Sequence, residues 1–491
     1  MASADESTYG LVIGGTEGPA AGGDGPVLDP ATNQPVARVA RASADDARHA
    51  LEVADRAFRE SGWAGDDGTK RAKALRKLAA RLDADLERFA RLETRNMGKP
   101  LRESRIDIGF VVQTLEYVAG LADKVEGTTV PVPGNRLDYT LREPLGVTVH
   151  IAPWNYPLLL AMRSVAPALA AGNAVVLKPA SLTPLTAVAL GRLAADAGIP
   201  AGILNVVPGP GGEVGRALVD DPRCASVSFT GSVEAGRQVA EIAARRIIPT
   251  TLELGGKSPA LVFPDADIDR AVRGVLWGIF GNAGQMCWAA SRLLVHESVR
   301  ADFLGKLQRS AEALKLGAGV DDGVEMGPVV SADQAEKVLG YVAAARADGG
   351  TVVTGGRRAE EPRLRAGNFV LPTIVDGVPV DSRAVREEIF GPVLAVAGFS
   401  ETDEAVRLAN ATRYGLLAAV YTRDLATAHT VARRLEAGMV TVNEAPITFP
   451  QTPFGGCKES GLGFEQGIRV VEAYTRQKNV LVNLGAAKKR A

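Results

Sequence analysis

The sequence predicts an α/β protein with parallel sheets, divided into two or three domains. Its 491 residues are more than one ordinary hydrophobic core organises. From residue 145 to about 450, short β-branched runs alternate with longer helical patterns, which is typical of parallel sheets covered by helices on both faces. Hydrophobic residues make up 46% and charged residues 23% of the chain, the composition of a folded globular protein.

Charge and terminal composition limit the classes of partner. The net charge of −1 gives no basic surface for nucleic acid or for an anionic membrane. No apolar run is long enough to cross a bilayer, and the polar N-terminus lacks the order of a signal peptide. We therefore expect a cytoplasmic protein with a small-molecule partner, and no binding to nucleic acid or membranes.

Metal and disulfide chemistry have little support in the sequence. Three cysteines lie far apart and form no Cys-x-x-Cys pair, which predicts free thiols at Cys224, Cys287 and Cys457. Four histidines are scattered without a ligand cluster, at His49, His150, His296 and His429. We expect no metal site.

The N-terminal third predicts a surface segment, three helices and a hairpin. Residues 1–35 are rich in Gly, Pro and Asp, which favours the surface. Apolar residues at spacings of three and four predict helices over 44–60, 70–96 and 103–121. Residues 128–142 read TTVPVPGNRLDYTLR, a hairpin pattern that needs another domain or chain to pack on.

Two alternating regions follow, and ligands of such sheets bind at the carboxyl ends of the strands. The first region predicts strands over 146–151, 174–177, 203–207, 226–229 and 250–254, with helices over 185–197 and 233–245. The second predicts helices over 267–280, 299–316 and 332–347, and strands over 292–295 and 393–399. A last short strand is predicted over 478–482.

Cys287 is the candidate nucleophile. It follows a predicted helix in Gly-Asn-Ala-Gly-Gln-Met-Cys-Trp, where Gly281 and Gly284 let the backbone approach a ligand closely. A cysteine on such a loop can present both its sulfur and its backbone N–H to a carbonyl group. The alternative is a buried structural cysteine.

Two other strand ends carry polar candidates. Glu253 stands between two leucines on a buried strand. A partly desolvated carboxylate there has a raised pKa and suits the role of general base. The alternative interpretation is a structural carboxylate that pairs with Lys257. Asn155 lies between two prolines on a rigid loop, where its amide either makes turn hydrogen bonds or donates to an oxyanion.

Three features could hold a cofactor. Lys178 ends the second strand and faces the ligand crevice, unless it is an ordinary surface lysine. The Gly-rich run 209–215, which contains Gly211, is one residue longer than the usual dinucleotide fingerprint. Ser232 follows Phe-Thr-Gly and opens a helix whose N-terminus could receive a pyrophosphate, or the serine simply caps the helix.

Together these segments resemble the aldehyde dehydrogenase superfamily over nearly the whole chain. The matching segments are Pro153-Trp-Asn-Tyr-Pro157, Lys178-Pro-Ala-Ser181, Phe229-Thr-Gly-Ser232, Glu253-Leu-Gly-Gly-Lys-Ser-Pro259, Gly284-Gln-Met-Cys287, Glu388-Ile-Phe-Gly-Pro392 and Pro453-Phe-Gly-Gly456. Any single segment is modest evidence, but seven in one order are strong evidence.

The resemblance implies a role for each residue. Cys287 would form a thiohemiacetal and then a thioester, Asn155 would hold the oxyanion and Glu253 would activate the hydrolytic water. The cofactor would be NAD, with NADP tolerated, and its expected contacts are Trp154, Lys178, Ser181, Gly211, Phe229, Thr230, Gly231, Ser232, Glu388 and Phe390. Release of the thioester to coenzyme A is the rival reaction, and Glu253 argues against it; a non-catalytic protein on the same fold is the other rival.

The resemblance also implies the domain organisation. A Rossmann-type cofactor domain would cover 1–127 and 145–254, and an α/β catalytic domain 255–470. An arm over 128–144 and 471–491 would build a homodimer or homotetramer.

Departures from the family pattern bear on specificity. Ser181 stands where many relatives with strong NAD preference carry Glu, which removes repulsion of a 2′-phosphate. Trp288 and Tyr156 could form an aromatic wall for an aromatic, medium apolar or amino aldehyde, unless Trp288 only packs in the core. Arg163 and Thr448 match semialdehyde dehydrogenases, but the second arginine of those enzymes is Gly281 here, and Arg163 could instead serve an interhelical salt bridge.

Overall fold

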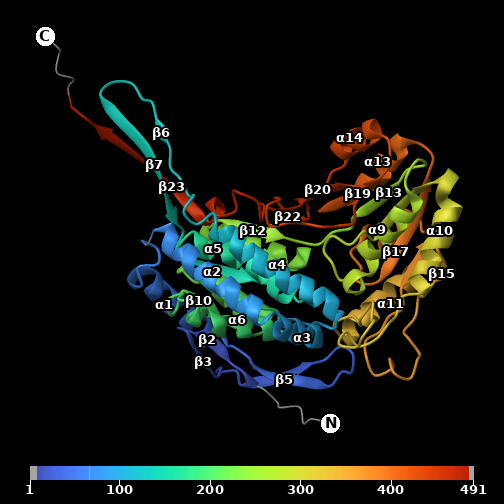
Figure 1. Ribbon diagram of the computed structural model, residues 1–491, viewed down its shortest axis with the longest axis horizontal. Coiled ribbons are helices and arrows are strands. Elements are labelled where there is room, and N and C mark those ends of the chain that lie inside the picture. Colours follow the sequence, from blue (N-terminus) through green and yellow to red (C-terminus); the bar gives the residue numbers. More distant parts are fainter. Residues whose placement is uncertain (1–7, 66, 486–491) are drawn as a thin grey trace.

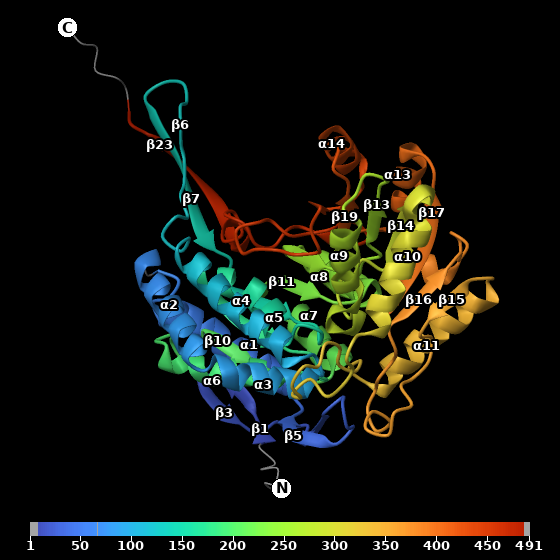
Figure 2. The same ribbon diagram turned by 45° about the vertical axis from the view of Figure 1, so that its right-hand side comes forward.

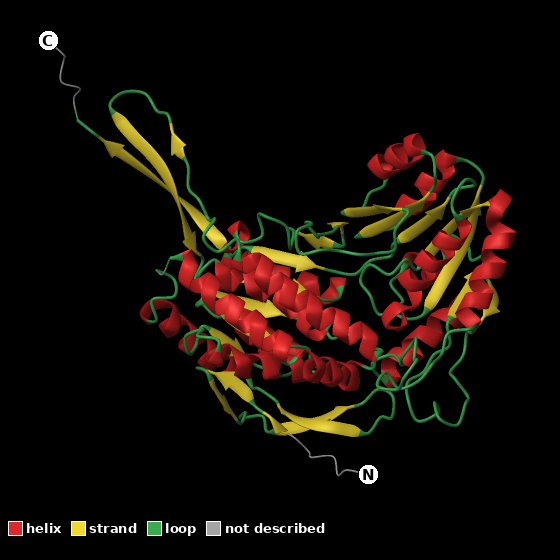
Figure 3. Ribbon diagram, viewed as in Figure 1, coloured by secondary structure: helices red, strands yellow, loops and turns green. Residues whose placement is uncertain are grey.

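The computed structural model describes residues 8–65 and 67–485, arranged as two α/β bodies with a projecting arm (Figure 1). The predicted α/β class is confirmed, and strands lie between helices in both bodies (Figure 3). Residues 1–7 and 486–491, which the predicted cofactor domain and arm include, lie outside the described residues.

The first body is built on an eight-stranded sheet of order β22-β12-β11-β8-β9-β10-β2-β3. Its parallel strands are β8 (Val147–Ile151), β9 (Ala174–Lys178), β10 (Leu204–Val206), β11 (Cys224–Thr230) and β12 (Thr250–Glu253). The antiparallel edges are β2 (Leu11–Ile13), β3 (Thr16–Gly18) and β22 (Gly461–Leu462). Every side chain of β9 is buried, as expected for a strand covered on both faces.

Two groups of helices pack on this sheet. The first group is α1 (Ala44–Glu60), α7 (Arg216–Asp220) and α8 (Val233–Arg246). The second group is α2 (Gly68–Ala84), α3 (Leu86–Met97), α4 (Leu101–Ala119), α5 (Pro157–Ala170) and α6 (Leu185–Asp196). The single helix predicted over 70–96 is wrong, because the chain leaves helical geometry at Asp85 and restarts as α3. Aspartate favours such a break because its short side chain competes for backbone hydrogen bonds.

The N-terminal segment is more structured than its composition indicated. A small sheet contains β1 (Thr8–Tyr9), β4 (Asp24–Leu28) and β5 (Pro35–Ala40). Leu11 and Val12 of β2 are buried in the main core, so the predicted surface segment supplies part of the large sheet. Strands this short carry no clear periodicity in the sequence.

The second body is built on a seven-stranded sheet of order β15-β16-β17-β14-β13-β19-β20. Its strands are β13 (Pro259–Val262), β14 (Arg292–His296), β15 (Thr351–Thr354), β16 (Thr373–Asp376), β17 (Val393–Phe399), β19 (Leu417–Tyr421) and β20 (Met439–Val442), of which only β15 is antiparallel. Its helices are α9 (Ile268–Phe280), α10 (Glu297–Glu312), α11 (Ala332–Ala347), α12 (Arg383–Arg386), α13 (Thr402–Asn410) and α14 (Leu425–Arg434).

The arm extends away from both bodies in two views (Figure 2). It contains the predicted hairpin, β6 (Thr129–Val130) and β7 (Arg136–Pro144), and the C-terminal strand β23 (Thr475–Asn483). Leu137, Leu141 and Leu481 on this sheet are 41%, 42% and 57% exposed, so the arm presents apolar side chains to its surroundings. Within residues 8–65 and 67–485, no helix has the length and apolar character needed to cross a membrane.

Candidate active site

The parallel strands of the first sheet end at a cavity of about 390 Å³, here called the strand-end cavity. The ends of β8, β9, β11 and β12 all contribute to its lining, as expected for a ligand crevice of a parallel sheet. Every residue predicted to contact the cofactor lines it: Trp154, Lys178, Ser181, Gly211, Phe229, Thr230, Gly231, Ser232, Glu388 and Phe390.

Two of these residues carry charges in partly dehydrated surroundings. Lys178 is 3% exposed, its amine donates to the Pro179 carbonyl, and burial lowers its pKa to about 8. Glu388 accepts from the Gly256 backbone N–H at 3.0 Å, and desolvation raises its pKa to about 7. Buried amine and carboxylate groups at a cavity wall suit the hydroxyl groups of a ribose.

The other contacts shape the same cavity. The Ser232 hydroxyl caps α8 by accepting from the Ala235 N–H, so the helix N-terminus opens at the cavity wall. The Ser181 hydroxyl donates to the Gly209 carbonyl at 2.9 Å and brings no charge. The Trp154 and Phe390 rings meet edge to face at 5.0 Å.

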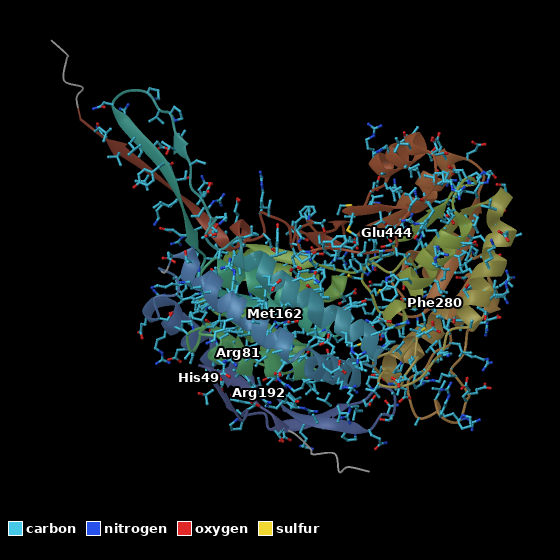
Figure 4. All side chains as sticks on the ribbon, in the orientation of Figure 1. His49, Arg81, Met162, Arg192, Phe280 and Glu444 are labelled. Atoms are coloured by element: carbon cyan, nitrogen blue, oxygen red, sulfur yellow. The ribbon has the colours of Figure 1, made fainter. Side chains whose placement is uncertain are left out.

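A second cavity, also of about 390 Å³, lies on the other side of Cys287 and is here called the aromatic cavity. All four residues predicted for a substrate pocket line it: Tyr156, Arg163, Trp288 and Thr448. Trp277, Phe110 and Phe454 extend the aromatic lining, and Trp288 meets Phe454 edge to face at 5.6 Å. Glu444, which follows β20 and is labelled in Figure 4, is an exposed member of this lining.

Cys287 lines both cavities and is half-buried between them. Desolvation raises the pKa of its thiol to about 12, the charge of Arg163 opposes this shift, and the charge of Glu253 adds to it. The thiol therefore lies at the junction of the two spaces and within electrostatic reach of an arginine and a carboxylate.

A left-handed turn places this cysteine. Asn282, Ala283 and Gly284 have φ of 47°, 51° and 73°. Left-handed geometry costs a non-glycine residue about 1–2 kcal/mol, so surrounding contacts must hold the turn. Glycine is required at two positions, because a Cβ on Gly284 would clash with the Gly391 carbonyl and one on Gly256 with the Cys287 carbonyl.

Glu253 ends β12 and is 2% exposed. Both of its carboxylate oxygens are buried without a hydrogen-bond partner, and it is not paired with Lys257, whose amine has no hydrogen-bond partner among the described residues. Burial raises the pKa of Glu253 well above its usual range, while the charge of Arg163 lowers it and that of Glu465 raises it. Glu253 directly precedes Leu254, which lines the strand-end cavity, and its charge acts on Cys287. A basic carboxylate in this position can accept a proton from water that enters the site.

Arg163 forms a buried ion pair with Glu465, with Nε and Oε2 2.5 Å apart and side chains 3% and 2% exposed. Glu465 lies in the loop after β22, so the pair is not interhelical as the alternative supposed. Within the part of the chain that the structure describes, one guanidinium nitrogen of Arg163 has no hydrogen-bond partner, and the guanidinium lies 4.4 Å from the Phe454 ring centre.

The Asn155 amide nitrogen donates to the Gln285 carbonyl at 2.9 Å, which leaves its second N–H for another acceptor. The Asn282 amide donates to the Asn155 carbonyl at 3.0 Å, so the β8 end and the left-handed turn are joined directly. Asn155, Cys287 and the strand-end cavity therefore form one connected unit.

Several lining residues were not found from the sequence. Gln334 and Lys337 of α11 line the strand-end cavity, and Phe454 lines the aromatic cavity. Helical spacing places the first two on one helix face but gives no sign of which sheet end they approach. Among the described residues, no cluster of three or more His, Cys, Asp or Glu side chains could hold a metal ion.

Comparisons with known proteins agree over nearly the whole chain. A family model described as the aldehyde dehydrogenase family matches residues 19–480. Betaine aldehyde dehydrogenase of Bacillus subtilis (strain 168) is 42% identical over 459 residues, 93% of this chain and 94% of that protein.

Two solved structures that carry a cofactor are similarly close. An NAD+ complex of an aldehyde dehydrogenase from Bacillus cereus has a TM-score of 0.95 at 40% identity, covering 98% of this chain and 97% of that one. Betaine aldehyde dehydrogenase from Staphylococcus aureus in complex with NAD+ has a TM-score of 0.96 at 37% identity, covering 98% and 96%.

Proposed function

The chain belongs to the aldehyde dehydrogenase family and is an NAD-dependent enzyme, and we propose that it oxidises its aldehyde through a thioester on Cys287 that water then hydrolyses. One observation carries this proposal: two cavities of equal volume meet at a single thiol, beside a buried carboxylate without partners. This arrangement suits a cofactor on one side of the sulfur and a substrate on the other.

In the first step the Cys287 thiolate attacks the aldehyde carbon and forms a thiohemiacetal oxyanion. The free N–H of the Asn155 amide and the Cys287 backbone N–H would donate to that oxygen. The carbon now carries O⁻ and hydrogen, and loss of hydride from it leaves the thioester. NAD, when bound, supplies the hydride acceptor.

In the second step Glu253 takes a proton from water, and the resulting hydroxide attacks the thioester carbon. The carbon–sulfur bond breaks, the carboxylic acid leaves, the Cys287 thiolate is regenerated, and Glu253 releases its proton to solvent. The unpartnered oxygens and raised pKa of Glu253 support this role, because a general base works best when its pKa lies near the working pH.

The strand-end cavity is proposed as the NAD site. Lys178 and Ser232 would hold the adenosine and pyrophosphate groups, while Glu388 and Phe390 would hold the nicotinamide end. Ser181 leaves the ribose 2′ position without a repelling carboxylate, which supports tolerance of NADP.

The proposed substrate is an aldehyde with an aromatic, medium apolar or amino-bearing tail. The aromatic lining formed by Tyr156, Trp288 and Phe454 supports this class, since aromatic faces bind both apolar groups and alkylammonium ions. Two relatives named betaine aldehyde dehydrogenase support the amino-bearing member of the class.

The experiment that tests the proposal is a substrate panel with purified protein. We expect NAD reduction with aromatic, aliphatic and trimethylammonium aldehydes of similar length, without added coenzyme A, and release of the carboxylic acid. Failure to reduce NAD with every aldehyde, or an absolute need for coenzyme A, would contradict it.

A semialdehyde with a carboxylate is the second candidate substrate. The free guanidinium nitrogen of Arg163 in the aromatic cavity favours it, whereas the buried pairing with Glu465 weakens the net positive charge. Arg163→Ala should raise KM for a semialdehyde at least about tenfold more than for a neutral aldehyde of equal length. Equal effects on both aldehydes would exclude this candidate.

We also propose the division into a cofactor domain (1–127 and 145–254), a catalytic domain (255–470) and an oligomerisation arm (128–144 and 471–491). The exposed leucines of the arm and the unpaired side of β20 support a homodimer or homotetramer, because apolar sheet faces and open strand edges favour association. Sedimentation of the intact protein would measure the state directly.

A further inference from the structure

Helix α4 begins with a carboxylate that contacts the nucleophile turn. Glu103 lies in the first turn of α4 and is 3% exposed. Its Oε2 accepts a hydrogen bond from the Asn282 backbone N–H at 2.9 Å. Its Oε1 is buried and has no hydrogen-bond partner among residues 8–65 and 67–485.

The receiving residue is the first of the left-handed turn. Asn282 has φ of 47°, and its side-chain amide donates to the Asn155 carbonyl at 3.0 Å and to the Gln285 carbonyl at 3.3 Å. The Gln285 amide donates back to the Asn282 carbonyl at 2.9 Å, and the Asn155 amide donates to the Gln285 carbonyl. The backbone N–H of Asn282 thus donates to Glu103, and the side-chain amide of Asn282 donates to the Asn155 carbonyl.

We propose that Glu103 is a positioning residue that holds the Asn282 N–H and thereby fixes the Cys287 turn and the Asn155 amide for the first chemical step. The inference rests on the proposed roles of Cys287 and Asn155. A left-handed turn with two non-glycine residues relaxes toward ordinary backbone geometry when its hydrogen-bond partners are lost.

A second buried carboxylate, that of Glu93, lies in the same charged surroundings as Glu103, near Lys99 and Asp107. Glu93 of α3 is fully buried, accepts from the Thr186 hydroxyl at 2.8 Å and also interacts with the Leu158 backbone at the start of α5. Burial raises the pKa of Glu93 and of Glu103 to about 7, and Lys99 opposes both shifts. Glu93 therefore shares burial and charge environment with Glu103, but its contacts go to Thr186 and the Leu158 backbone and not to the nucleophile turn.

The test compares three variants of intact protein. Glu103→Met fills the space but offers no acceptor to the Asn282 N–H. It should lower kcat about 100-fold, since misplacing reacting groups such as Cys287 by about 1 Å costs that much. KM for NAD should be unchanged. Glu103→Gln keeps a carbonyl oxygen for the Asn282 N–H and should retain kcat within about threefold. Glu93→Gln should also retain kcat. Glu103→Asp, which withdraws the acceptor and keeps the charge, replaces the Met variant if that one does not fold.

Amide hydrogen exchange supplies a readout that does not depend on activity. In Glu103→Met, exchange of a peptide containing 281–287 should be at least about tenfold faster than in the wild type, and in Glu103→Gln it should be nearly unchanged. An unchanged kcat in the Met variant, or an equal loss of kcat in Glu93→Gln, would overturn the proposal. A wild-type protein without aldehyde oxidation would instead contradict the proposed function, while the exchange data would still decide whether Glu103 holds the turn.

Discussion

The two cavities that meet at Cys287 have the same volume but are built differently. The strand-end cavity takes much of its lining from the carboxyl ends of four parallel strands, and its position follows from the sheet. The aromatic cavity is lined mostly by side chains of helices and loops, such as Trp288, Phe454 and Thr448. Under the proposed function, the sheet would therefore fix where the cofactor lies, whereas individual side chains would set which aldehyde fits.

The shared residue should give the largest effect. Cys287→Ala should lower aldehyde oxidation by on the order of 10⁴-fold or more, because no other group can form the thioester. NAD binding measured by fluorescence should survive, since the sulfur contributes little to that cavity. Cys457→Ser is the control, and a comparable loss of activity in that variant would contradict the assignment.

The thiol should also respond strongly to pH when both cavities hold only solvent. A pKa of about 12 means that the thiolate fraction rises about tenfold for each pH unit below that value. Alkylation of Cys287 by iodoacetamide should therefore accelerate by roughly 10³-fold between pH 7 and pH 10, followed by mass spectrometry. A rate that levels off near neutral pH would mean that the cavities stabilise the thiolate far more than the structure indicates.

Glu253 should separate the two chemical steps. Glu253→Gln removes the base for thioester hydrolysis, so turnover should fall by about 10²–10⁴-fold. Because the first step remains, rapid mixing should give a burst of reduced NAD equal to the enzyme concentration, with the acyl group on Cys287. Loss of the burst together with turnover would assign Glu253 to the first step instead.

Trp288 tests the independence of the aromatic cavity. Trp288→Ala should raise KM for an aromatic aldehyde about tenfold or more, since a missing apolar contact in a pocket costs that much. KM for NAD should stay constant. An equal rise in both constants would show that the two cavities are mechanically coupled and not separate.

A substitution at Ser181 tests whether the strand-end cavity can be altered without affecting the aldehyde site. Its expected effect on activity is among the smallest of the variants at this site. Ser181→Glu should lower kcat/KM with NADP about tenfold by repulsion of the 2′-phosphate and leave kcat/KM with NAD within about threefold. KM for the aldehyde serves as the control. If the wild type had no activity with NADP, the proposed tolerance of NADP would be wrong.

Residues predicted from the sequence line both cavities, but only those of the strand-end cavity could be located from the predicted sheet. Lys178 and Glu253 could be located because a strand end has a known position relative to a parallel sheet. The pairing of Arg163 with Glu465, which are 302 positions apart, has no local signal in the sequence. The contact between Glu103 and Asn282 was missed for the same reason, since it joins the start of one helix to a turn after another.

In the fold, too, some elements could be predicted from the sequence and others could not. Some strands and helices of ordinary length were predicted closely, for example α11 and β17, whereas others in the second body, such as β13, β19 and α14, were not predicted. The break at Asp85 and the short strand β2 were not predicted either, because one polar residue or three apolar ones are too few to set a period. The break at Asp85 depends on one local residue, whereas β2 is placed by its pairing with β10, in which Val12 lies opposite the distant residue Val206.

Gly255 and Gly256 cannot be replaced by alanine, although such replacements are a common way to stabilise an enzyme. Neither Gly255 nor Gly256 has a positive φ, so alanine would suit the backbone, and such replacements usually stabilise a protein by reducing the freedom of its unfolded chain. A methyl group on Gly255 would meet the Glu388 carboxylate, and one on Gly256 the Cys287 carbonyl. Attempts to raise the thermal tolerance of this protein must therefore keep this Gly-Gly pair and place stabilising substitutions elsewhere.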